Sequence, residues 1–437
     1  MERHLTVAVI GLGKIGLPIA AQYASRGPRV IGVDIRSDVV ASLNAGKSHI
    51  AGEAFLDDRV SEAVAAGSLR ATQDLSTAVA EADVVVVAIP LITDADGKAE
   101  FGAIDDVTWT IGSSLKSGTL VLYETTLPLG TTRGRLGPVL EMRSGLRLGE
   151  TLFLAFSPER VYSGRIFEDL AKYPKIVGGV DPQSTARAVD FYSSVLEADV
   201  LAVANAETAE FAKLAETTYR FVNIALADQL ALFGRERGVN ISEAFAAANT
   251  QPFSQIHQPG IGVGGHCIPV YPRFLLEASR NGELSLIRDA QQVDSAMPAA
   301  YVKLLSDALG ELQGKRVVVL GVSYRQNVKE TAYSAAFPVV TALKERGASV
   351  AVHDPLFSDE ELKDLGFEVV SLQEVTPADA VIVQAFHAQY RDLDWKVFRG
   401  LRAVIDGRGD LPADTLSGSD SALISLGTST RLGYPAR

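Results

Sequence analysis

The chain has very little cysteine. Cys267 is the only one among 437 residues, so no disulfide can form within one chain. Residues 1–16 have the pattern of a strand and a glycine turn, not of a charged stub with an apolar signal core, so we expect no secretion signal there. Both observations predict a protein of the reducing cytoplasm.

Long hydrophobic runs and basic clusters are missing as well. Apolar runs such as DVVVVAIP fall short of the ~20 residues that a membrane-spanning helix needs. The formal net charge of −12 is dispersed, and no group of Lys and Arg has the density that follows a phosphate backbone. We therefore expect neither a membrane nor a nucleic acid as partner.

The chain does have length and a regular alternation of strands and helices. It exceeds the ~250 to 300 residues at which one hydrophobic core stops growing, so several domains are expected. Short β-branched runs alternate with helical stretches, which is typical of a parallel sheet with helices on both faces. The runs of the first half are LTVAVIGLG, RVIGVDI, DVVVVAIP, TLVLYET, LFLAFSPE and PKIVGG, and those of the last part are GKRVVVLGVSY, ASVAVHDP, DAVIVQAF, RAVIDGR and SALISLG.

The region between these two alternations is helical. From about Ala204 to Gly238 apolar residues recur at intervals of three and four, and helix continues to about residue 312. The stripe comprises Phe211, Leu214, Ala215, Phe221, Val222, Ala225, Gln229, Leu232 and Phe233. We predict an α/β fold with two Rossmann-like doubly wound domains, 1–203 and 312–437, joined by a helical domain, 204–311. The long stripe predicts a two-fold homodimer through this helix.

A glycine-rich turn follows the first strand. VAVIGLGKIG puts Gly11, Gly13 and Gly16 in GxGxxG spacing before a helix, which allows a tight turn and close approach of a pyrophosphate to the helix N-terminus. Asp34 ends the second strand, where a carboxylate bonds the ribose 2′-hydroxyl and repels a 2′-phosphate. Arg36 is of the type that accepts such a phosphate. The pattern favours NAD over NADP, against the alternative of a turn that binds nothing.

The single cysteine lies among glycines in GVGGHCIPVYP. A lone cysteine is most often a small hydrophobe, but Gly264 and Gly265 let the backbone fold closely around a ligand. His266 and Cys267 lack the spaced second pair of a tetrahedral zinc site, so no metal is expected. Beside a nicotinamide, a thiolate can add to an aldehyde. The thiohemiacetal then loses a second hydride to give a thioester, which water hydrolyses to an acid.

The chain resembles the nucleotide-sugar 6-dehydrogenases of the UDP-glucose, GDP-mannose and UDP-N-acetylhexosamine type over nearly its whole length. Six motifs in order carry the resemblance: GLGKIG, ETTLPLGTT, SPERVYSG, AEFAKLAETTYRFVNIALADQLA, PGIGVGGHCIPV and GKRVVVLGVSYR. The cysteine motif is nearest to the UDP-N-acetylmannosamine and UDP-N-acetylglucosamine branch. The resemblance implies NAD binding by the first domain, a dimer through the central helix, and nucleotide binding by the last domain.

The resemblance also implies roles for single residues. Cys267 matches the nucleophile, Lys213 the lysine that stabilises oxyanions, Glu159 the carboxylate that handles the hydrolytic water, and Thr126 a threonine that helps to hold that water. Alone, Lys213 could be a solvated helix residue and Glu159 a loop charge. The expected cofactor contacts are Gly11, Gly13, Lys14, Ile15, Gly16, Asp34, Arg36, Pro90 and Thr126. The expected substrate contacts are Arg160, Val161, Lys213, Thr217, Arg220, His257, Gly260, Gly264, Gly265, Tyr324, Arg325 and Arg408.

Three positions depart from the family pattern. Tyr271 stands where the family usually has aspartate, Thr217 where it has asparagine, and Ala332 where it has arginine. We predict NAD-dependent oxidation of the 6-hydroxymethyl group of a nucleotide sugar to a carboxylate, for surface polysaccharide synthesis. UDP-N-acetylmannosamine or UDP-N-acetylglucosamine is favoured over UDP-glucose and GDP-mannose. Two alternatives stay open: a two-electron hydroxy-acid dehydrogenase, in which Cys267 has no task, and a decayed NAD-binding or regulatory protein.

Overall fold

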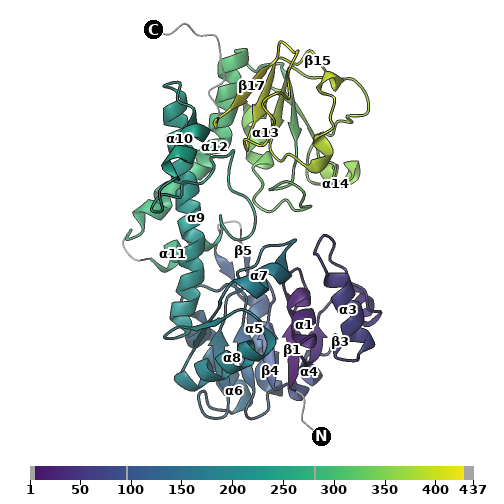
Figure 1. The fold of residues 1–437 in the computed structure, drawn as a ribbon, viewed down its shortest axis with the longest axis vertical. Helices are drawn as coiled ribbons and strands as arrows, with labels where there is room; N and C mark the ends of the chain where they lie inside the picture. Colours follow the sequence, from purple (N-terminus) through teal and green to yellow (C-terminus); the bar gives the residue numbers. More distant parts are fainter. Residues whose placement is uncertain (1–4, 95–96, 280–281, 428–437) are drawn as a thin grey trace. The chain divides into compact units, whose positions relative to one another are not determined.

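The computed structural model describes residues 5–94, 97–279 and 282–427 (Figure 1). The chain divides into two compact units, residues 1–216 and residues 217–437, and each contains its own parallel sheet. The long helix α9 (Ala206–Arg235) begins in the first unit and ends in the second. Across the described ranges, no helix combines the length and the apolar character that crossing a membrane requires.

The first unit is built on an eight-stranded sheet with the order β10-β9-β8-β7-β4-β1-β2-β3. The strands are β1 (Thr6–Ile10), β2 (Arg29–Val33), β3 (Leu69–Thr72), β4 (Val84–Val87), β7 (Leu120–Tyr123), β8 (Phe153–Phe156), β9 (Lys175–Gly179) and β10 (Val200–Ala202), and β5 (Ile92–Thr93) pairs separately with β6 (Ala99–Glu100). Only β8 and β9 are antiparallel neighbours within the main sheet. The carboxyl ends of β1, β4, β7 and β8 therefore share one edge.

Helices cover both faces of this sheet, because successive side chains of a strand point to opposite faces. In β1, Val7 and Val9 pack in one buried cluster with side chains of α1, α3, α7 and α8, whereas Ala8 and Ile10 pack in another with α4, α5 and α6. The helices are α1 (Gly16–Ala24), α2 (Ser37–Asn44), α3 (Leu56–Ala65), α4 (Leu75–Glu81), α5 (Gly102–Ser114), α6 (Gly137–Ser144), α7 (Ile166–Lys172) and α8 (Pro182–Val195), with a π-helical turn η1 (Thr132–Leu136). Burial of both faces explains the continuous apolar strands of the sequence.

The second unit carries a five-stranded, wholly parallel sheet with the order β12-β11-β14-β16-β17. Its strands are β11 (Arg316–Leu320), β12 (Ser349–His353), β14 (Ala380–Val383), β16 (Ala403–Asp406) and β17 (Ala422–Ser425), and β13 (Thr376–Pro377) pairs with β15 (Phe398–Arg399). Its helical elements are α10 (Ile241–Ala248), α11 (Tyr271–Ala278), α12 (Ser285–Leu309), α13 (Ala336–Glu345), α14 (Asp359–Asp364), η2 (Ala388–Tyr390) and η3 (Trp395–Val397). The alternation predicted for the last part of the sequence is confirmed.

The two faces of the second sheet are covered differently. Val317 and Val319 pack against α12 and α13, which are long helices. Val318 and Leu320, on the opposite face, pack in a cluster that includes Tyr390 from the short turn η2 and residues of the neighbouring loops. The sheet of the second unit is therefore Rossmann-like, but 3-10 turns and loops cover one of its faces where helices cover the other.

The predicted apolar stripe of α9 divides into two faces. Leu214, Phe221 and Ala225 are buried within the chain, at 0%, 2% and 4% exposure. A second set of large apolar side chains on the same helix is exposed, comprising Phe211, Tyr219, Leu226, Leu230 and Phe233. The stripe was thus drawn too broadly from the sequence, because intervals of three and four fit both faces of so long a helix.

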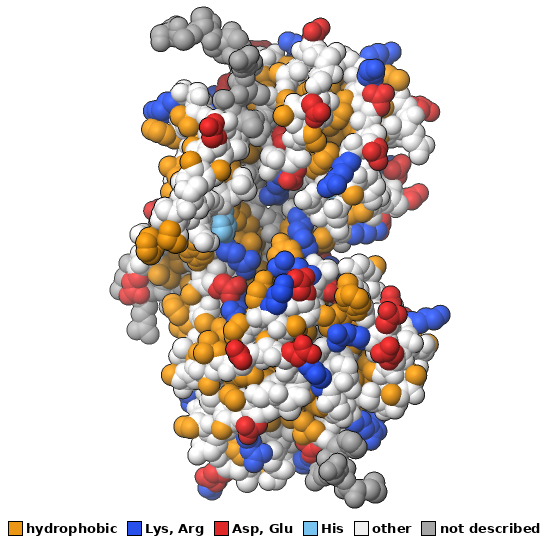
Figure 2. Space-filling view, viewed as in Figure 1, with side chains coloured by type: hydrophobic (Ala, Val, Ile, Leu, Met, Phe, Trp, Pro, Cys, Tyr) orange, Lys and Arg blue, Asp and Glu red, His pale blue; other side chains and the backbone are white. Residues whose placement is uncertain are grey.

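Charge is spread over the surface. On the face shown in Figure 2, acidic and basic side chains are interspersed with apolar ones. Charged side chains also form ion pairs, such as Arg70 with Glu81 at 3.0 Å and Lys303 with Asp307 at 2.7 Å. This face has the dispersed pattern that the sequence indicated.

Candidate active site

The glycine turn lies at the carboxyl end of β1. Gly11 has φ +88°, and a Cβ placed there would lie 2.9 Å from Ile89 Cγ2. A Cβ on Gly16 would lie 1.8 Å from Gly11 O, so the turn and the first residue of α1 touch directly. A Cβ on Gly13, in contrast, would meet nothing within 4 Å. Gly11 and Gly16 therefore pack tightly, whereas Gly13 faces open space, where a pyrophosphate can approach. This arrangement fits the roles that the GxGxxG spacing predicts.

Asp34 follows β2 beside this turn. Its Oδ2 accepts from Leu12 N at 3.0 Å and its Oδ1 accepts from Arg36 N at 2.9 Å. Each carboxylate oxygen has room for a second donor, so Asp34 can still accept from ribose hydroxyls. The Arg36 guanidinium is paired with Asp38, with Nε 3.1 Å from Oδ1. This pairing offsets the charge that would attract a 2′-phosphate.

Candidate residues also follow the neighbouring strands β4, β7 and β8. Pro90 is exposed after β4, and Thr126 is buried after β7. Glu159 follows β8, and its backbone oxygen accepts from Lys213 Nζ at 2.7 Å. Lys213 therefore lies next to Glu159, as is necessary if the two residues belong to one site. Ligands of open α/β sheets bind at such carboxyl ends.

A buried ionic network lies behind Glu159, and the sequence analysis missed it. Lys175 Nζ is 2.8 Å from Glu159 Oε2 and 3.0 Å from Glu124 Oε2. Glu124 Oε1 accepts from the hydroxyls of Tyr23 at 2.9 Å and Tyr192 at 2.8 Å. Burial raises the pKa of Glu124, and the nearby Lys175 ammonium opposes that shift. A lysine that opens an otherwise apolar strand was the only local signal for this network.

In the second unit, Cys267 is exposed just before α11. Its Sγ lies 3.5 Å from the Tyr271 hydroxyl, and the Tyr271 ring packs on Phe274 with centroids 5.8 Å apart. The residue that replaces the family's aspartate is therefore in hydrogen-bonding distance of the sulfur. In this geometry the Cys267 thiol donates to the Tyr271 hydroxyl, and a phenol, unlike a carboxylate, is not suited to act as a general base near neutral pH.

The glycines before Cys267 pack on residues predicted to bind the nucleotide. A Cβ on Gly264 would lie 2.6 Å from Tyr324 Cβ, and one on Gly265, at φ +93°, would lie 3.0 Å from the Tyr324 ring. Gly260 approaches Arg408, whose Nη1 would be 3.4 Å from a Cβ there. Arg408 donates from Nη2 to Tyr324 O at 3.2 Å. The structure thus brings together Gly260, Gly264, Gly265, Tyr324 and Arg408.

Two carboxylates, buried Asp228 and half-buried Asp294, hold the same glycine segment, and neither was predicted from the sequence. Asp228 Oδ1 accepts from Gly260 N, and Asp294 Oδ1 accepts from Val263 N, each at 2.8 Å. Burial raises the pKa of Asp228 to about 8 and that of Asp294 to about 6. Burial also lowers the pKa of the neighbouring Arg408. The segment that leads to Cys267 therefore rests on groups that titrate near neutrality.

The remaining predicted contacts occupy separate places. Arg325 Nε donates to the Tyr324 hydroxyl at 3.1 Å, and His257 N donates to Asn223 Oδ1 at 2.9 Å. Arg160 Nη1 lies 3.7 Å from Glu216 Oε2. The other predicted positions lie on or beside these elements: Lys14, Ile15, Val161, Thr217 and Arg220. Ala332 is one of the three positions that depart from the family pattern. Its backbone oxygen accepts from Gly265 N at 2.8 Å, so this position supports the cysteine loop through its main chain.

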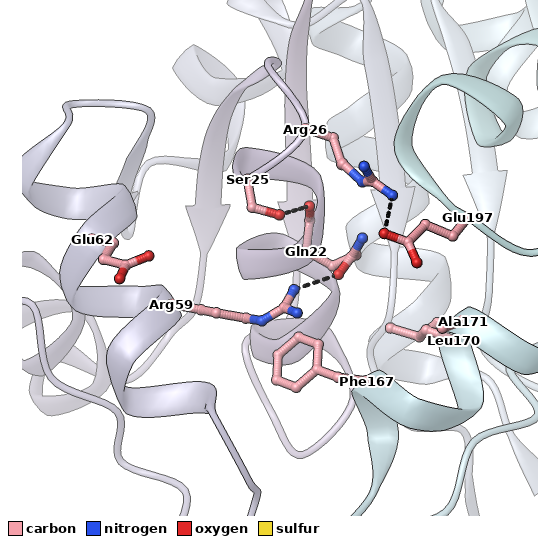
Figure 3. Close-up of a pocket in the computed structure, with 9 residues that line it drawn as sticks. All are labelled: Gln22, Ser25, Arg26, Arg59, Glu62, Phe167, Leu170, Ala171 and Glu197. Atoms are coloured by element: carbon pink, nitrogen blue, oxygen red, sulfur yellow. Dashed lines mark hydrogen bonds and ion pairs between the residues drawn. The ribbon is translucent and has the colours of Figure 1, made fainter.

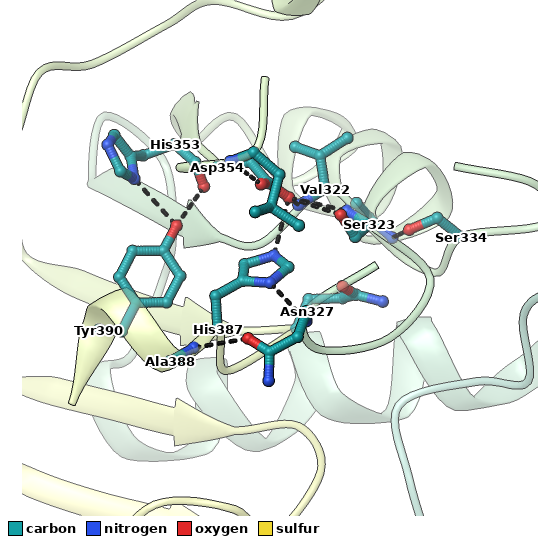
Figure 4. Close-up of polar contacts among 12 residues, drawn as sticks. Val322, Ser323, Asn327, Ser334, His353, Asp354, His387, Ala388 and Tyr390 are labelled. Atoms are coloured by element: carbon teal, nitrogen blue, oxygen red, sulfur yellow. Dashed lines mark hydrogen bonds and ion pairs between the residues drawn. The ribbon is translucent and has the colours of Figure 1, made fainter. Parts of the chain in front are cut away.

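A polar network lies beyond the carboxyl ends of β11, β12 and β14 in the second unit (Figure 4). Asp354, after β12, accepts at Oδ2 from Val322 N at 2.7 Å, Ser323 N at 2.9 Å and His387 Nε2 at 3.0 Å. Asn327 N donates to His387 Nδ1 at 2.9 Å, which leaves the ring proton on Nε2. Burial alone would raise the pKa of Asp354, but these hydrogen bonds lower it overall. The network fixes both ends of the segment that carries Tyr324 and Arg325.

A pocket of about 320 Å³ lies elsewhere in the first unit, near the last turn of α1 (Figure 3). Its two arginines already have protein partners: Arg59 Nη1 donates to Gln22 Oε1 and Arg26 Nη2 lies on Glu197 Oε1, both at 2.6 Å. The pocket is at the opposite end of α1 from Gly16, so it does not belong to the strand-end site.

Comparisons with known proteins match the whole arrangement. Sequence models of the UDP-glucose/GDP-mannose dehydrogenase family match three successive parts of the chain: the NAD binding domain at residues 5–196, the central domain at 207–296 and the UDP binding domain at 318–411. A UDP-N-acetyl-D-mannosamine dehydrogenase from Pyrococcus horikoshii is 36% identical over 415 residues, which cover 92% of this chain and 95% of that protein. An NDP-N-acetyl-D-galactosaminuronic acid dehydrogenase from Ralstonia solanacearum is 34% identical over 420 residues, which cover 94% and 97%.

The solved structures agree with the sequence matches. A structure of a UDP-D-ManNAc dehydrogenase from Pyrococcus horikoshii superposes with a TM-score of 0.87 at 33% identity, covering 97% of this chain and 99% of that one. The predicted family, the α/β fold with a helical middle and NAD as cofactor are confirmed. The chain therefore belongs to the UDP-glucose/GDP-mannose dehydrogenase family and is an NAD-dependent nucleotide-sugar dehydrogenase.

Proposed function

We propose that the enzyme oxidises the 6-hydroxymethyl group of a nucleotide sugar to a carboxylate through a covalent intermediate on Cys267. The observation that carries the proposal is the position of this exposed thiol, in a segment that packs on Tyr324 and approaches Arg408. A two-electron hydroxy-acid dehydrogenase has no task for such a thiol. The position of the Cys267 thiol therefore favours the four-electron reaction over a two-electron oxidation.

The proposed steps use four residues of the chain. NAD, when bound, accepts a hydride in each of the two oxidations. Lys213 stabilises negative charge on the sugar oxygen, and the Cys267 thiolate adds to the aldehyde to form a thiohemiacetal. After the second oxidation, water held by Thr126 attacks the thioester carbonyl and gives its proton to Glu159, and the C–S bond breaks. The reaction balances as R–CH₂OH + 2 NAD⁺ + H₂O giving R–COO⁻ + 2 NADH + 3 H⁺.

The residues that would bind the sugar nucleotide are those that the second unit brings together. Guanidinium groups bind phosphate oxygens in a bidentate manner, so Arg325 and Arg408 suit a diphosphate. UDP-N-acetylmannosamine is the favoured substrate and UDP-N-acetylglucosamine the next, because relatives from Pyrococcus horikoshii and Escherichia coli are named for the former. The uronate product would feed surface polysaccharide synthesis, in the reducing cytoplasm where a free catalytic thiol persists.

The exposed face of α9 supports the predicted dimer. Phe211, Tyr219, Leu226, Leu230 and Phe233 are each at least 39% exposed. Exposed aromatic and leucine side chains on one helix fit an isologous interface, in which this face meets its own copy. Sedimentation at micromolar concentration tests this assignment, and a monomer would contradict it. Leu226→Glu together with Leu230→Glu should then give monomers that remain folded.

Stoichiometry tests the chemistry. With a panel of UDP- and GDP-sugars, we expect two NADH per sugar over many turnovers. Cys267→Ser should block acid formation, because an alkoxide adduct forms and breaks less readily than a thiolate adduct. Iodoacetamide should inactivate the wild type and leave Cys267→Ser unlabelled, since Cys267 is the only cysteine. Undiminished acid production by the variant would refute the covalent mechanism, and a single burst of NADH on every sugar would favour a decayed enzyme.

A further inference from the structure

The buried lysine of the first unit joins the two strand ends that carry candidate catalytic residues. Lys175 Nζ bonds the carboxylates of Glu124 and Glu159, at 3.0 and 2.8 Å. Glu124 directly follows β7, two positions before Thr126, and Glu159 lies after the neighbouring strand β8. One ammonium group therefore ties together the segments that present Thr126 and Glu159.

The Lys175 ammonium is unusually well enclosed. The Lys175 side chain is 4% exposed, that of Glu124 is 0% and that of Glu159 is 10%. The ammonium also lies 4.9 Å from the centre of the Tyr192 ring. Burial disfavours the charge of Lys175, but the two carboxylates outweigh that effect and raise its pKa.

Among the described residues, Lys175 forms the ion pair with the Glu159 carboxylate. Glu159 Oε1 accepts from Arg160 N at 2.8 Å, and Lys213 Nζ donates to the Glu159 backbone oxygen at 2.7 Å. The Arg160 guanidinium lies 3.7 Å from Glu216. The other titratable groups around the network are Tyr23 on α1, Tyr192 on α8, Glu124 after β7 and Asp169 on α7, which accepts from Tyr162 N at 2.8 Å.

We propose, on the basis of the function proposed above, that Lys175 is a positioning residue whose ammonium pairs with the Glu159 carboxylate and holds it aligned to take a proton from the hydrolytic water. In thioester hydrolysis the water oxygen bonds to the carbonyl carbon, its proton passes to Glu159, and the thiolate of Cys267 leaves with the electrons of the C–S bond. A neutral Glu159 could not accept that proton. Glu124, held by two tyrosine hydroxyls, fixes Lys175 in place and competes with Glu159 for its charge.

The proposal makes opposite predictions for the two partners of Glu159. Lys175→Met removes the counter-charge, so the acid limb of the pH profile of kcat should move to higher pH by at least about one unit. Glu124→Gln removes the competing carboxylate while keeping an acceptor oxygen, so the same limb should move to lower pH. Lys175→Arg retains the charge and should restore most of the hydrolytic rate. Lys172→Met is the matched control, because Lys172 is an exposed lysine on α7 that pairs with Glu168.

A second readout separates positioning from general damage. If hydrolysis alone is slowed, Lys175→Met should show a normal burst of NADH, an unchanged KM for the nucleotide sugar, and an acyl adduct on Cys267 in intact-protein mass spectrometry at pH 7. A wild-type pH profile without adduct in Lys175→Met would overturn the proposal while leaving the covalent mechanism intact. If Lys175→Met does not fold, the pH profile of kcat in Glu124→Gln tests the proposal instead. An acid limb that is unchanged or moves to higher pH in Glu124→Gln would overturn the proposal. Undiminished acid production by Cys267→Ser would instead contradict the proposed function, oxidation through a covalent intermediate on Cys267.

Discussion

Gly11 and Gly321 occupy equivalent places in the two sheets. Their φ angles are +88° and +86°, and their amides donate to the last residue of the adjacent strand, Val33 O and His353 O, each at 2.8 Å. Each turn is followed by a backbone amide that donates to a carboxylate beyond that strand. The two units thus repeat one structural element, a glycine turn held by an aspartate.

The two aspartates differ in what remains available to a ligand. Asp34 is half-buried and accepts one backbone amide at each oxygen, whereas Asp354 is 2% exposed and accepts at Oδ2 from three residues, including His387. The helix also begins differently, since α1 starts at Gly16 but α13 starts only at Ala336. A dinucleotide needs both a free carboxylate and a helix N-terminus at the turn. In the second unit, His387 thus bonds the carboxylate whose counterpart is open in the first unit, and this bond helps to fix the segment that carries Tyr324.

The largest effect should come from the glycine contact that only the first unit has. Gly16→Ala places a Cβ 1.8 Å from Gly11 O, a backbone atom that cannot move aside, so we expect a loss of roughly 4 kcal/mol in unfolding free energy. Gly13→Ala is the matched control, because a Cβ there meets nothing within 4 Å. It should unfold like the wild type yet bind NAD at least about tenfold more weakly. Urea unfolding and calorimetric titration measure both, and equal stability of the two variants would contradict the geometry.

The next effect tests the support in the second unit. His387→Leu leaves a buried carboxylate short of one donor and Asn327 N without its acceptor, at a cost of roughly 3 kcal/mol. UDP affinity should fall because the Tyr324 segment is anchored there, while NAD affinity should stay unchanged. His387→Gln keeps a donor for Asp354 and should lose less of both stability and UDP affinity. Parallel weakening of NAD and UDP binding would show that the two crevices are not independent.

Local signals account for what could be predicted from the sequence. β-branched runs predicted the strands, and the spacing of Gly11, Gly13 and Gly16 predicted the cofactor turn, because each pattern is complete within about twenty residues. The buried networks could not be found this way. Glu124 and Tyr23 are 101 positions apart, and Glu124 and Lys175 are 51 apart, so only the fold reveals that they meet.

One feature of the second unit was nevertheless visible in the sequence. Asp354 ends the second strand of its sheet, as Asp34 does in the first, so the repeated element itself could have been recognised. The partner of Asp354 could not, because His387 lies after a different strand and nothing local marks it as buried. The prediction for the apolar stripe of α9 did not separate buried from exposed side chains, for a related reason. Periodicity identifies an amphipathic helix but does not say which of two apolar faces its own chain covers.

Rising pH should remove a stabilising contribution of Asp228 in the second unit. Burial raises the pKa of Asp228 to about 8 from its ordinary value of 3.8, so between these pH values the folded state holds a proton that the unfolded state has released. The stabilising contribution is full below the unfolded pKa and is lost as the pH rises toward 8. Between pH 6.5 and 8 the wild type should lose roughly 2 kcal/mol relative to Asp228→Asn, which has no proton to lose.

Urea unfolding at pH 6.5, 7.25, 8 and 9 checks this effect. The difference between Asp228→Asn and the wild type should grow up to about pH 8 and then level off. Asp294, with a pKa of about 6, contributes mainly at lower pH and should not obscure this window. Asp289→Asn, an exposed position on the same helix as Asp294, should follow the wild type at every pH. A pH-independent difference would show that Asp228 is ionised in the folded protein.

The smallest expected effect concerns the open carboxylate of the first unit. Asp34→Asn removes the charge that repels a 2′-phosphate and leaves Arg36 able to approach one, so the preference for NAD over NADP should fall at least about tenfold in kcat/KM, or roughly 1.4 kcal/mol. Asp354→Asn is the matching change in the second unit, where His387 and the backbone already occupy the carboxylate. It should lower stability and leave the cofactor ratio unchanged. Steady-state rates with both cofactors, at saturating nucleotide sugar, separate the two outcomes. An unchanged ratio in Asp34→Asn would mean that the ribose is recognised elsewhere, and a changed ratio in Asp354→Asn would mean that the two crevices communicate.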